Sequence, residues 1–127
     1  MGSMKISIII LNFNGASLLK KNLPSVITAV KKSTYSCEII VADNGSTDSS
    51  RDVVAHFPTV KWLGFDKNYG YGEGNNKAIA HVHSDYVILL NTDIIVDTDF
   101  IEPLYRASSH AHVFAVSCRQ KVIVGDT

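Results

Sequence analysis

The residues whose types best fit chemistry are short polar groups that directly follow apolar runs. In the clearest case Asn91-Thr92-Asp93 follows the run 86–90, which shows no alternation of polar and apolar residues. An amide and a carboxylate at the end of a buried strand need partners, because unpaired burial is costly. A divalent cation with a diphosphate would satisfy Asp93, since hard cations prefer oxygen ligands. The simpler alternative is that Asn91 and Asp93 form a turn that caps the next element.

Two further polar groups follow earlier apolar runs. Asn12 ends one such run, and Asp43-Asn44-Gly45-Ser46 comes directly after another. Asn-Gly is a strong hairpin signal when two strands flank it. Here the next segment, residues 49–57, carries apolar side chains at helical spacing and stops before a proline. A tight turn into a helix is therefore favoured, with Ser46 or Thr47 as the N-cap.

Apolar runs and helical periodicities alternate along the chain. Runs rich in β-branched residues predict strands, and apolar residues recurring every three or four positions predict helices. The alternation implies an α/β domain with a mainly parallel sheet and helices on both faces, in which the apolar strand 86–90 is central. Pro24 is expected to kink the first helix or reset its start. The predicted strands are 5–11, 37–42, 60–63 and 86–90, with short ones at 113–117 and 122–124, and the predicted helices are 16–30, 49–57, one that follows the loop 64–76 and ends near 83, and 100–109.

This topology brings the polar groups together. The carboxyl ends of parallel strands meet at one edge of the sheet, where open α/β sheets bind ligands. The loops after the first, second and fourth strands should share that edge. It would collect Asn12, Asp43, Asn44, Asn91 and Asp93.

Composition limits the classes of partner. The 127 residues are 46% hydrophobic and 19% charged, which is ordinary for one globular domain. The net charge is zero, so overall charge favours neither nucleic acid nor an acidic membrane surface as a partner. Cys37 and Cys118 lie in apolar contexts, and buried free thiols in a reducing compartment are the simpler interpretation. Residues 1–3 resemble a cloning remnant, no leader or long apolar segment is visible, and residues 4–127 are expected to form one cytoplasmic domain.

Two other motifs give only weak indications of function. Gly70, Gly72 and Gly74 alternate in the least structured stretch and invite comparison with a dinucleotide-binding fingerprint. That comparison fails, because the pattern ends in Asn75 and follows the third strand rather than the first. The histidines occur two residues apart or singly and show no zinc spacing with cysteines, so solvated histidines are the simpler interpretation.

Four stretches in a specific order span most of the chain: residues 8–15, 41–48, 68–76 and 89–93. Together they resemble the donor-binding half of family 2 glycosyltransferases, and most closely a rhamnosyltransferase-like bacterial group. The resemblance implies the GT-A fold, a Rossmann-like, mainly parallel sheet with helices on both faces, here truncated after the metal-motif region. In such enzymes an Asp-x-Asp motif binds the metal, and Asn91 replaces its first acid, a common variant in that group.

The resemblance implies a nucleotide-sugar site with Mg²⁺ or Mn²⁺ as the metal, bound by Asp93 and the two phosphates. The loop after the first strand would cup the base. The Asp43 carboxylate would accept a hydrogen bond from the imide N–H of that base. The glycine-rich stretch would let the backbone approach the nucleotide closely. The expected nucleotide-sugar contacts are Leu11, Asn12, Phe13, Asp43, Asn44, Gly70, Gly72, Asn75, Asn76, Asn91 and Thr92.

The implied activity is inverting transfer of a sugar from a nucleoside diphosphate to a saccharide or lipid-linked acceptor, in cell-surface polysaccharide synthesis. The base that activates the acceptor lies in a later half of such enzymes, so no catalytic residue is assigned to this chain. We expect it to bind donor weakly and turn over little alone. An uncovered apolar surface would favour self-association, and the full-length protein could lie at the inner face of the membrane.

Several alternatives remain open at this stage. A non-catalytic α/β binding or assembly module of the same fold would explain the same elements. A nucleotidyltransferase is less favoured, since the glycine-rich loop that it would need after the first strand is missing. Uridine, thymidine and guanosine donors all fit a base read by Asp43, although the resemblance suggests dTDP-rhamnose.

Overall fold

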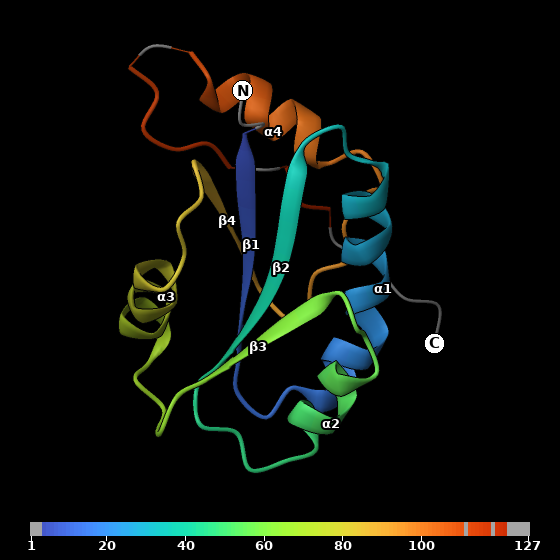
Figure 1. Cartoon of the computed structure of the whole chain (residues 1–127), viewed down its shortest axis with the longest axis vertical. Helices are drawn as coiled ribbons and strands as arrows, with labels where there is room; N and C mark the ends of the chain where they lie inside the picture. Colours follow the sequence, from blue (N-terminus) through green and yellow to red (C-terminus); the bar gives the residue numbers. More distant parts are fainter. Residues whose placement is uncertain (1–3, 111, 118, 122–127) are drawn as a thin grey trace.

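Strands and helices alternate along the whole described chain. The computed structural model describes residues 4–110, 112–117 and 119–121. Its elements are β1 (Lys5–Asn12), α1 (Ala16–Lys32), β2 (Ser36–Asp43), α2 (Ser50–Ala55), β3 (Val60–Gly64), α3 (Tyr71–Ala80), β4 (Tyr86–Leu90) and α4 (Ile101–Ser108). Every strand pairing is parallel, and the strand order is β3-β2-β1-β4 (Figure 1). The predicted α/β class with a mainly parallel sheet is confirmed.

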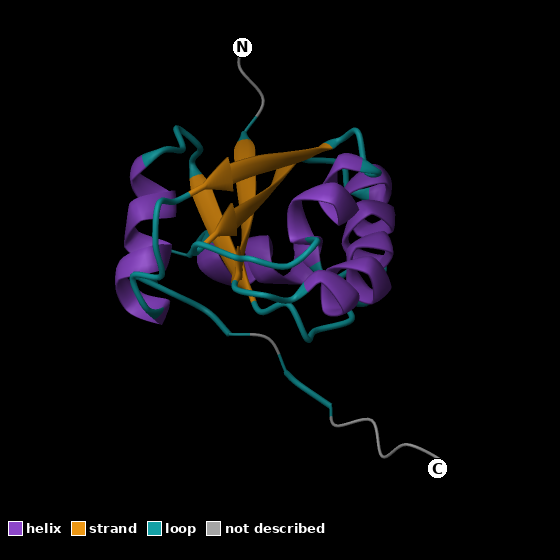
Figure 2. Cartoon of the chain, turned by 90° about the horizontal axis from the view of Figure 1, so that it is seen from below, coloured by secondary structure: helices purple, strands orange, loops and turns teal. Residues whose placement is uncertain are grey.

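Helices cover both faces of the sheet. Figure 2 shows α3 on one side of the strands and the α1 layer on the other. The larger core lies on the α1 side, where Ile8 and Leu23 pack with Ile101 of α4. The smaller core joins Ile9 of β1 to Ala78 of α3. β1 and β2 are the two internal strands of the described sheet, and both contribute to both cores. In the described ranges, no helix is both long and apolar enough to cross a bilayer.

The apolar strand β4 lies at the edge of the described sheet, not at its centre as predicted. In this part of the chain β4 pairs only with β1, whereas β1 has β2 and β4 on its two sides. Leu89 is 43% exposed, and the other β4 side chains are half-buried. An unbroken apolar run indicates two apolar faces, but it carries no information on whether both edges are paired. This is why the prediction was wrong.

The glycine-rich stretch is partly helical, which the sequence did not predict. α3 begins at Tyr71, so Gly72 and Gly74 belong to it. A Cβ on Gly74 would come within 2.9 Å of Asn44 Nδ2 and 3.0 Å of Leu11 Cδ1. Glycine weakens a helix by roughly 1 kcal/mol per residue relative to alanine. At Gly74 this cost is offset, because the missing side chain lets α3 pack directly against the ends of β1 and β2.

Other segments also differ from the predictions or lie beyond them. α1 runs through Pro24 as one helix to Lys32, so its start is not reset. Residues 113–117 are not a strand, because they pair with no strand of the described sheet. Residues 122–124 and Cys118 lie outside the described residues. Cys37 is a free, half-buried thiol, and burial raises its pKa.

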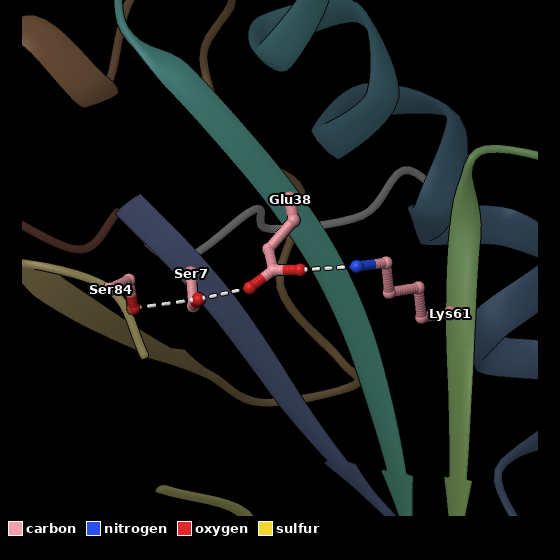
Figure 3. A network of polar contacts seen from close by, with 4 residues as sticks. All are labelled: Ser7, Glu38, Lys61 and Ser84. Atoms are coloured by element: carbon pink, nitrogen blue, oxygen red, sulfur yellow. Dashed lines mark hydrogen bonds and ion pairs between the residues drawn. The ribbon is translucent and has the colours of Figure 1, made fainter. Parts of the chain in front are cut away.

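A polar chain crosses the α3 side of the sheet near the amino ends of the strands (Figure 3). Ser84 Oγ donates to Ser7 Oγ at 2.7 Å, and Ser7 Oγ donates to Glu38 Oε2 at 2.6 Å. Lys61 Nζ donates to Glu38 Oε1 at 2.7 Å. The ammonium and the hydroxyl lower the pKa of Glu38. This network of polar contacts provides hydrogen-bond partners for the hydroxyl of Ser7, which is completely buried. It also joins residues of β1, β2 and β3 with the segment that leads into β4.

Replacing Glu38 by glutamine is expected to lower the free energy of unfolding by about 0.5–1 kcal/mol, because the Lys61 pair is partly exposed and screened by solvent. The folded-state pKa of Glu38 is depressed below its ordinary value of 4.5. Its contribution is therefore present above that value and lost as the pH falls through the lower folded-state pKa. The free energies of unfolding of the variant and the parent chain, measured with urea at neutral pH and in acid, should become equal in acid. A difference that stays constant would contradict the expectation.

Candidate functional site

The carboxyl ends of β1, β2 and β4 meet at one edge of the sheet, as predicted. The register places Asn12 opposite Asp43 and Ile10 opposite Leu90, so the loops that follow leave the sheet side by side. Asn12 Nδ2 donates to Asp43 Oδ1 at 2.8 Å, and the Asn44 amide donates to the Asn12 carbonyl at 2.8 Å. The ends of β1 and β2 are thus linked by both side chains and backbone.

The Asp43 carboxylate is 4% exposed and is already held by the protein. Its Oδ1 accepts from Asn12 Nδ2 and from Ser46 Oγ at 2.6 Å, and its Oδ2 accepts from the Ser46 amide at 2.8 Å. A carboxylate offers about four acceptor positions. One position on Oδ2 therefore remains for a further donor, and the direction of that position is fixed by the other three bonds.

Asn44 is buried and holds the glycine-rich loop against the end of β2. Its Nδ2 donates to the Gly70 carbonyl at 3.0 Å, and its Oδ1 accepts from the Tyr69 amide at 3.1 Å. Gly45 follows with a φ of +83°, and a Cβ on it would lie 2.8 Å from the Lys67 carbonyl carbon. Both residues therefore position the loop by direct contact with its backbone.

Four residues that the sequence interpretation did not assign to the site, Asn14, Ser46, Thr47 and Asp48, join the loops after β1 and β2. The Asn14 amide donates to Ser46 Oγ at 2.8 Å, and Asn14 Oδ1 accepts from the Thr47 amide at 2.8 Å. Asp48 Oδ2 accepts from the Ala16 amide at the start of α1 at 3.0 Å. Asn14 has a positive φ of 51°, a conformation that asparagine adopts more readily than most residues.

Asp48 also serves the start of α2, where Ser46 or Thr47 was predicted as the cap. The Ser50 amide and hydroxyl both donate to Asp48 Oδ1, whereas the residue at the N-cap position, Ser49, makes no side-chain capping bond. Desolvation acts to raise the pKa of Asp48, but the hydrogen bonds from Ser50 Oγ and from the Ala16 and Ser50 amides outweigh it and lower the pKa. One carboxylate therefore caps two helices.

The other predicted nucleotide contacts differ in accessibility. Phe13 is 51% exposed, and Asn12 is fully buried. Leu11 packs in the smaller core. Gly70, Gly72 and Asn76 are exposed. Asn75 is 5% exposed, and its Nδ2 has no hydrogen-bond partner among the described residues.

The loop after β4 is attached to α1. Asn22 Nδ2 donates to the Thr92 carbonyl at 2.6 Å, and Ser25 Oγ accepts from the Val96 amide at 3.2 Å. Asn91 and Asp93 are exposed. Neither Asn22 nor Ser25 was predicted as a site residue, because the sequence does not show which segment packs against this helix.

The acidic residues of this edge do not form a ready-made metal cage. In the described part of the chain, no three His, Cys, Asp or Glu side chains lie close enough to share an ion. Mg²⁺ is commonly held by one or two carboxylates together with substrate phosphates and water. The exposed carboxylate of Asp93 fits this mode, in which a diphosphate supplies the remaining charged oxygens.

Comparison with known proteins identifies the family. The model of glycosyl transferase family 2 matches residues 7–127. The chain belongs to this family. Among curated relatives of this glycosyltransferase domain, "Glycosyltransferase GlyA" of Streptococcus pneumoniae serotype 4 is 30% identical over 105 residues, which are 80% of this chain and 15% of that protein.

Solved structures show that this family 2 domain has the GT-A fold. The mannosyltransferase PcManGT of Pyrobaculum calidifontis, in complex with GDP-Man and Mn²⁺, matches with a TM-score of 0.82 at 20% identity, over 95% of this chain and 37% of that one. The glucosyl-3-phosphoglycerate synthase of Mycobacterium tuberculosis, in complex with Mn²⁺, UDP and glucosyl-3-phosphoglycerate, matches with a TM-score of 0.66 at 22% identity, over 83% and 39% of the two chains. The chain therefore spans well under half of the proteins that it matches.

Proposed function

We propose that this chain binds the nucleoside-diphosphate sugar donor of a glycosyltransferase, with Asp43 recognising the base and Asp93 holding Mg²⁺ or Mn²⁺ against the diphosphate. The observation that carries the proposal is the position of both carboxylates at the one edge where β1, β2 and β4 of a family 2 domain end. Support also comes from the two structural neighbours, whose complexes contain Mn²⁺ with GDP-Man or with UDP.

The proposed base site follows from the unused acceptor position on Asp43 Oδ2. The imide N–H of uracil or thymine, or the N1–H of guanine, is a donor of the required kind. Phe13, half exposed beside this edge, would pack on the base. Asn75 Nδ2, for which the described part of the chain offers no partner, is a further donor for the nucleotide. In this proposal Asn12 acts indirectly, because it is buried and orients the Asp43 carboxylate.

In the proposed reaction, the cation when bound neutralises charge on the leaving nucleoside diphosphate. Asp93 would supply its protein carboxylate, and Asn91 and Thr92 would line the sugar diphosphate. A saccharide or lipid-linked hydroxyl would attack the anomeric carbon from the opposite face, with inversion, in polysaccharide synthesis. No catalytic base is assigned within this chain, since the resemblance places that base in a later, acceptor-binding part.

The test is an NMR titration of the ¹⁵N-labelled chain with UDP, GDP and dTDP, each with and without Mg²⁺, alongside the Asp93→Ala variant. We expect metal-dependent shift changes at Asp43, Asn76 and Asp93, with the metal dependence lost in the variant. The relative affinities of the three nucleotides would then indicate the donor base, including whether dTDP is preferred. Asp97→Ala, which removes a nearby exposed acid, is the matched control and should retain metal dependence.

No nucleotide binding by the folded chain at millimolar concentration would contradict the proposal for this chain. A non-catalytic module of the same fold would give that result. Binding that is equally strong without metal and in Asp93→Ala would retain the nucleotide site but remove Asp93 from it.

A further inference from the structure

We propose that Asn22 of α1 is the positioning residue of the segment Asn91-Thr92-Asp93, and that it sets the direction in which the Asp93 carboxylate is presented. The inference rests on the proposed role of Asp93 in cation and diphosphate binding. It adds a residue that lies 71 positions earlier in the chain, on a different element, and that the sequence interpretation assigned no function.

The first observation is the anchor itself. Asn22 Nδ2 donates to the Thr92 carbonyl at 2.6 Å, across 70 positions of sequence. Thr92 directly precedes Asp93, so this bond fixes the peptide unit that joins the two residues. Gly15, which directly precedes α1, lies near the same segment, since a Cβ on it would come to an ordinary van der Waals distance of 3.6 Å from Thr92 Cγ2.

The second observation is that Asn22 is a polar side chain inside an apolar helix face. It is 5% exposed and lies beside Leu19, Leu23 and Val26, all of which are buried in the larger core. Burying an amide there costs free energy unless its groups are paired. An apolar residue would serve the core better, so the amide is explained by what it holds rather than by packing.

The third observation concerns the other atom of the amide. Asn22 Oδ1 is buried and has no hydrogen-bond partner among the described residues. Asn22 lines a cavity of about 10 Å³ together with Asn91 and Thr92, which is close to the minimum volume for one water. A water there, or the side-chain amide of Asn91, would supply the missing donor. Both atoms of the Asn22 amide would then be directed to the Asn91–Asp93 segment.

These observations assign Asn22 a role in orientation and not in chemistry. It is buried beneath the segment, so it would contact neither the cation nor the donor. Groups that orient a metal ligand affect metal affinity by roughly 10–100-fold when they are removed. The Ser25 hydroxyl holds the far end of the same loop at the Val96 amide, so α1 holds the loop on both sides of Asp93.

The test uses Asn22→Leu, an apolar side chain of similar size that suits the neighbouring Leu19 and Leu23 but cannot donate to the Thr92 carbonyl. Asn22→Ala is the second variant, in case the leucine side chain does not fit. Thr28→Val is the matched control, because Thr28 lies on the exposed side of α1 and its hydroxyl donates to the Pro24 carbonyl of the same helix.

We expect the Asn22 variants to remain folded, to lower the ¹⁵N heteronuclear NOE of the amides of residues 92–94, and to bind Mn²⁺ about tenfold more weakly in the presence of nucleotide, as measured by water-proton relaxation. Nucleotide affinity without metal and the NOE values of residues 43–48 should not change. A purely structural role would lower the melting temperature and leave the Mn²⁺ affinity of the folded chain unchanged, and that result would overturn the proposal.

Unchanged NOE values at residues 92–94 in a folded Asn22 variant would also overturn it. If the parent chain itself binds no Mn²⁺ with nucleotide, the proposed function has failed. The NOE comparison then still decides whether Asn22 holds the segment, so the two failures can be told apart.

Discussion

Replacing Gly45 by alanine is expected to destabilise the domain by about 3–5 kcal/mol, because backbone strain and steric overlap act together. Gly45 has a φ of +83°, which side chains other than glycine rarely adopt. Its added Cβ would lie 2.8 Å and 2.9 Å from two backbone atoms of Lys67. Backbone atoms cannot move aside as a flexible side chain can, so the loops after β2 and β3 would have to separate. Urea unfolding followed by far-UV circular dichroism measures the loss.

Gly70→Ala is the matched control for this substitution. Gly70 has a nearly identical φ of +82°, but among the described residues beyond its two chain neighbours no heavy atom lies within 4 Å of the position that its Cβ would take. It should cost only the backbone strain, about 1–3 kcal/mol. Equal losses at the two positions would contradict the steric argument and would indicate that the loops after β2 and β3 are free to separate.

Replacing Asp43 by alanine is expected to lower the free energy of unfolding by about 3 kcal/mol and to remove nucleotide binding. Hydrogen bonds to a charged group contribute about 1.5–3 kcal/mol each, although such contributions are not additive. The substitution would leave the Ser46 amide without its acceptor in a nearly inaccessible site, and Asn12 Nδ2 would keep only its longer bond, 3.2 Å, to Ser46 Oγ. Unfolding by urea and titration with nucleotide measure the two effects separately.

Asp43→Asn separates the two roles of this side chain. Its remaining carbonyl oxygen can still accept from Asn12 Nδ2 and Ser46 Oγ, and only the Ser46 amide loses its acceptor, so the loss of stability should be smaller than with alanine. Its amide group would face the nucleotide with donors instead of an acceptor, so base binding should be lost to the same extent. Nucleotide binding that survives in a folded Asp43→Asn variant would show that the base is not recognised by this carboxylate.

The arrangement of strands was largely predictable, because apolar runs and helical spacing carry information about local structure. The strand at 86–90 was predicted at its observed bounds, and the alternation of elements required a parallel sheet. What failed was the lateral position of that strand. Edge pairing involves only backbone groups, which are the same in every residue, so side-chain pattern says nothing about it.

The candidate site was predictable only in part, for a similar reason. Asp43 ends β2 and Asp93 lies three positions after the end of β4, so strand direction was enough to place them on one edge. Asn22 and Asp48 act through contacts between segments far apart in sequence. The sequence places Asn22 among apolar residues of its helix face, but it does not show which distant segment either side chain contacts. The helical start of α3 was missed because glycine opposes helices locally, whereas contact with Leu11 and Asn44 favours glycine there.

Helix α1 sets the distance between the two halves of the proposed site. Its first residue, Ala16, is bound to Asp48 and so to the loops around Asp43, while Asn22, six positions on, is bound to the loop that carries Asp93. Six residues of α-helix advance about 9 Å. The length of helix between Ala16 and Asn22 thus fixes the spacing between the two loops. One residue inserted between Ala16 and Asn22 would turn the second anchor by about 100° around the helix axis, whereas changes in length elsewhere in α1 would leave the spacing intact.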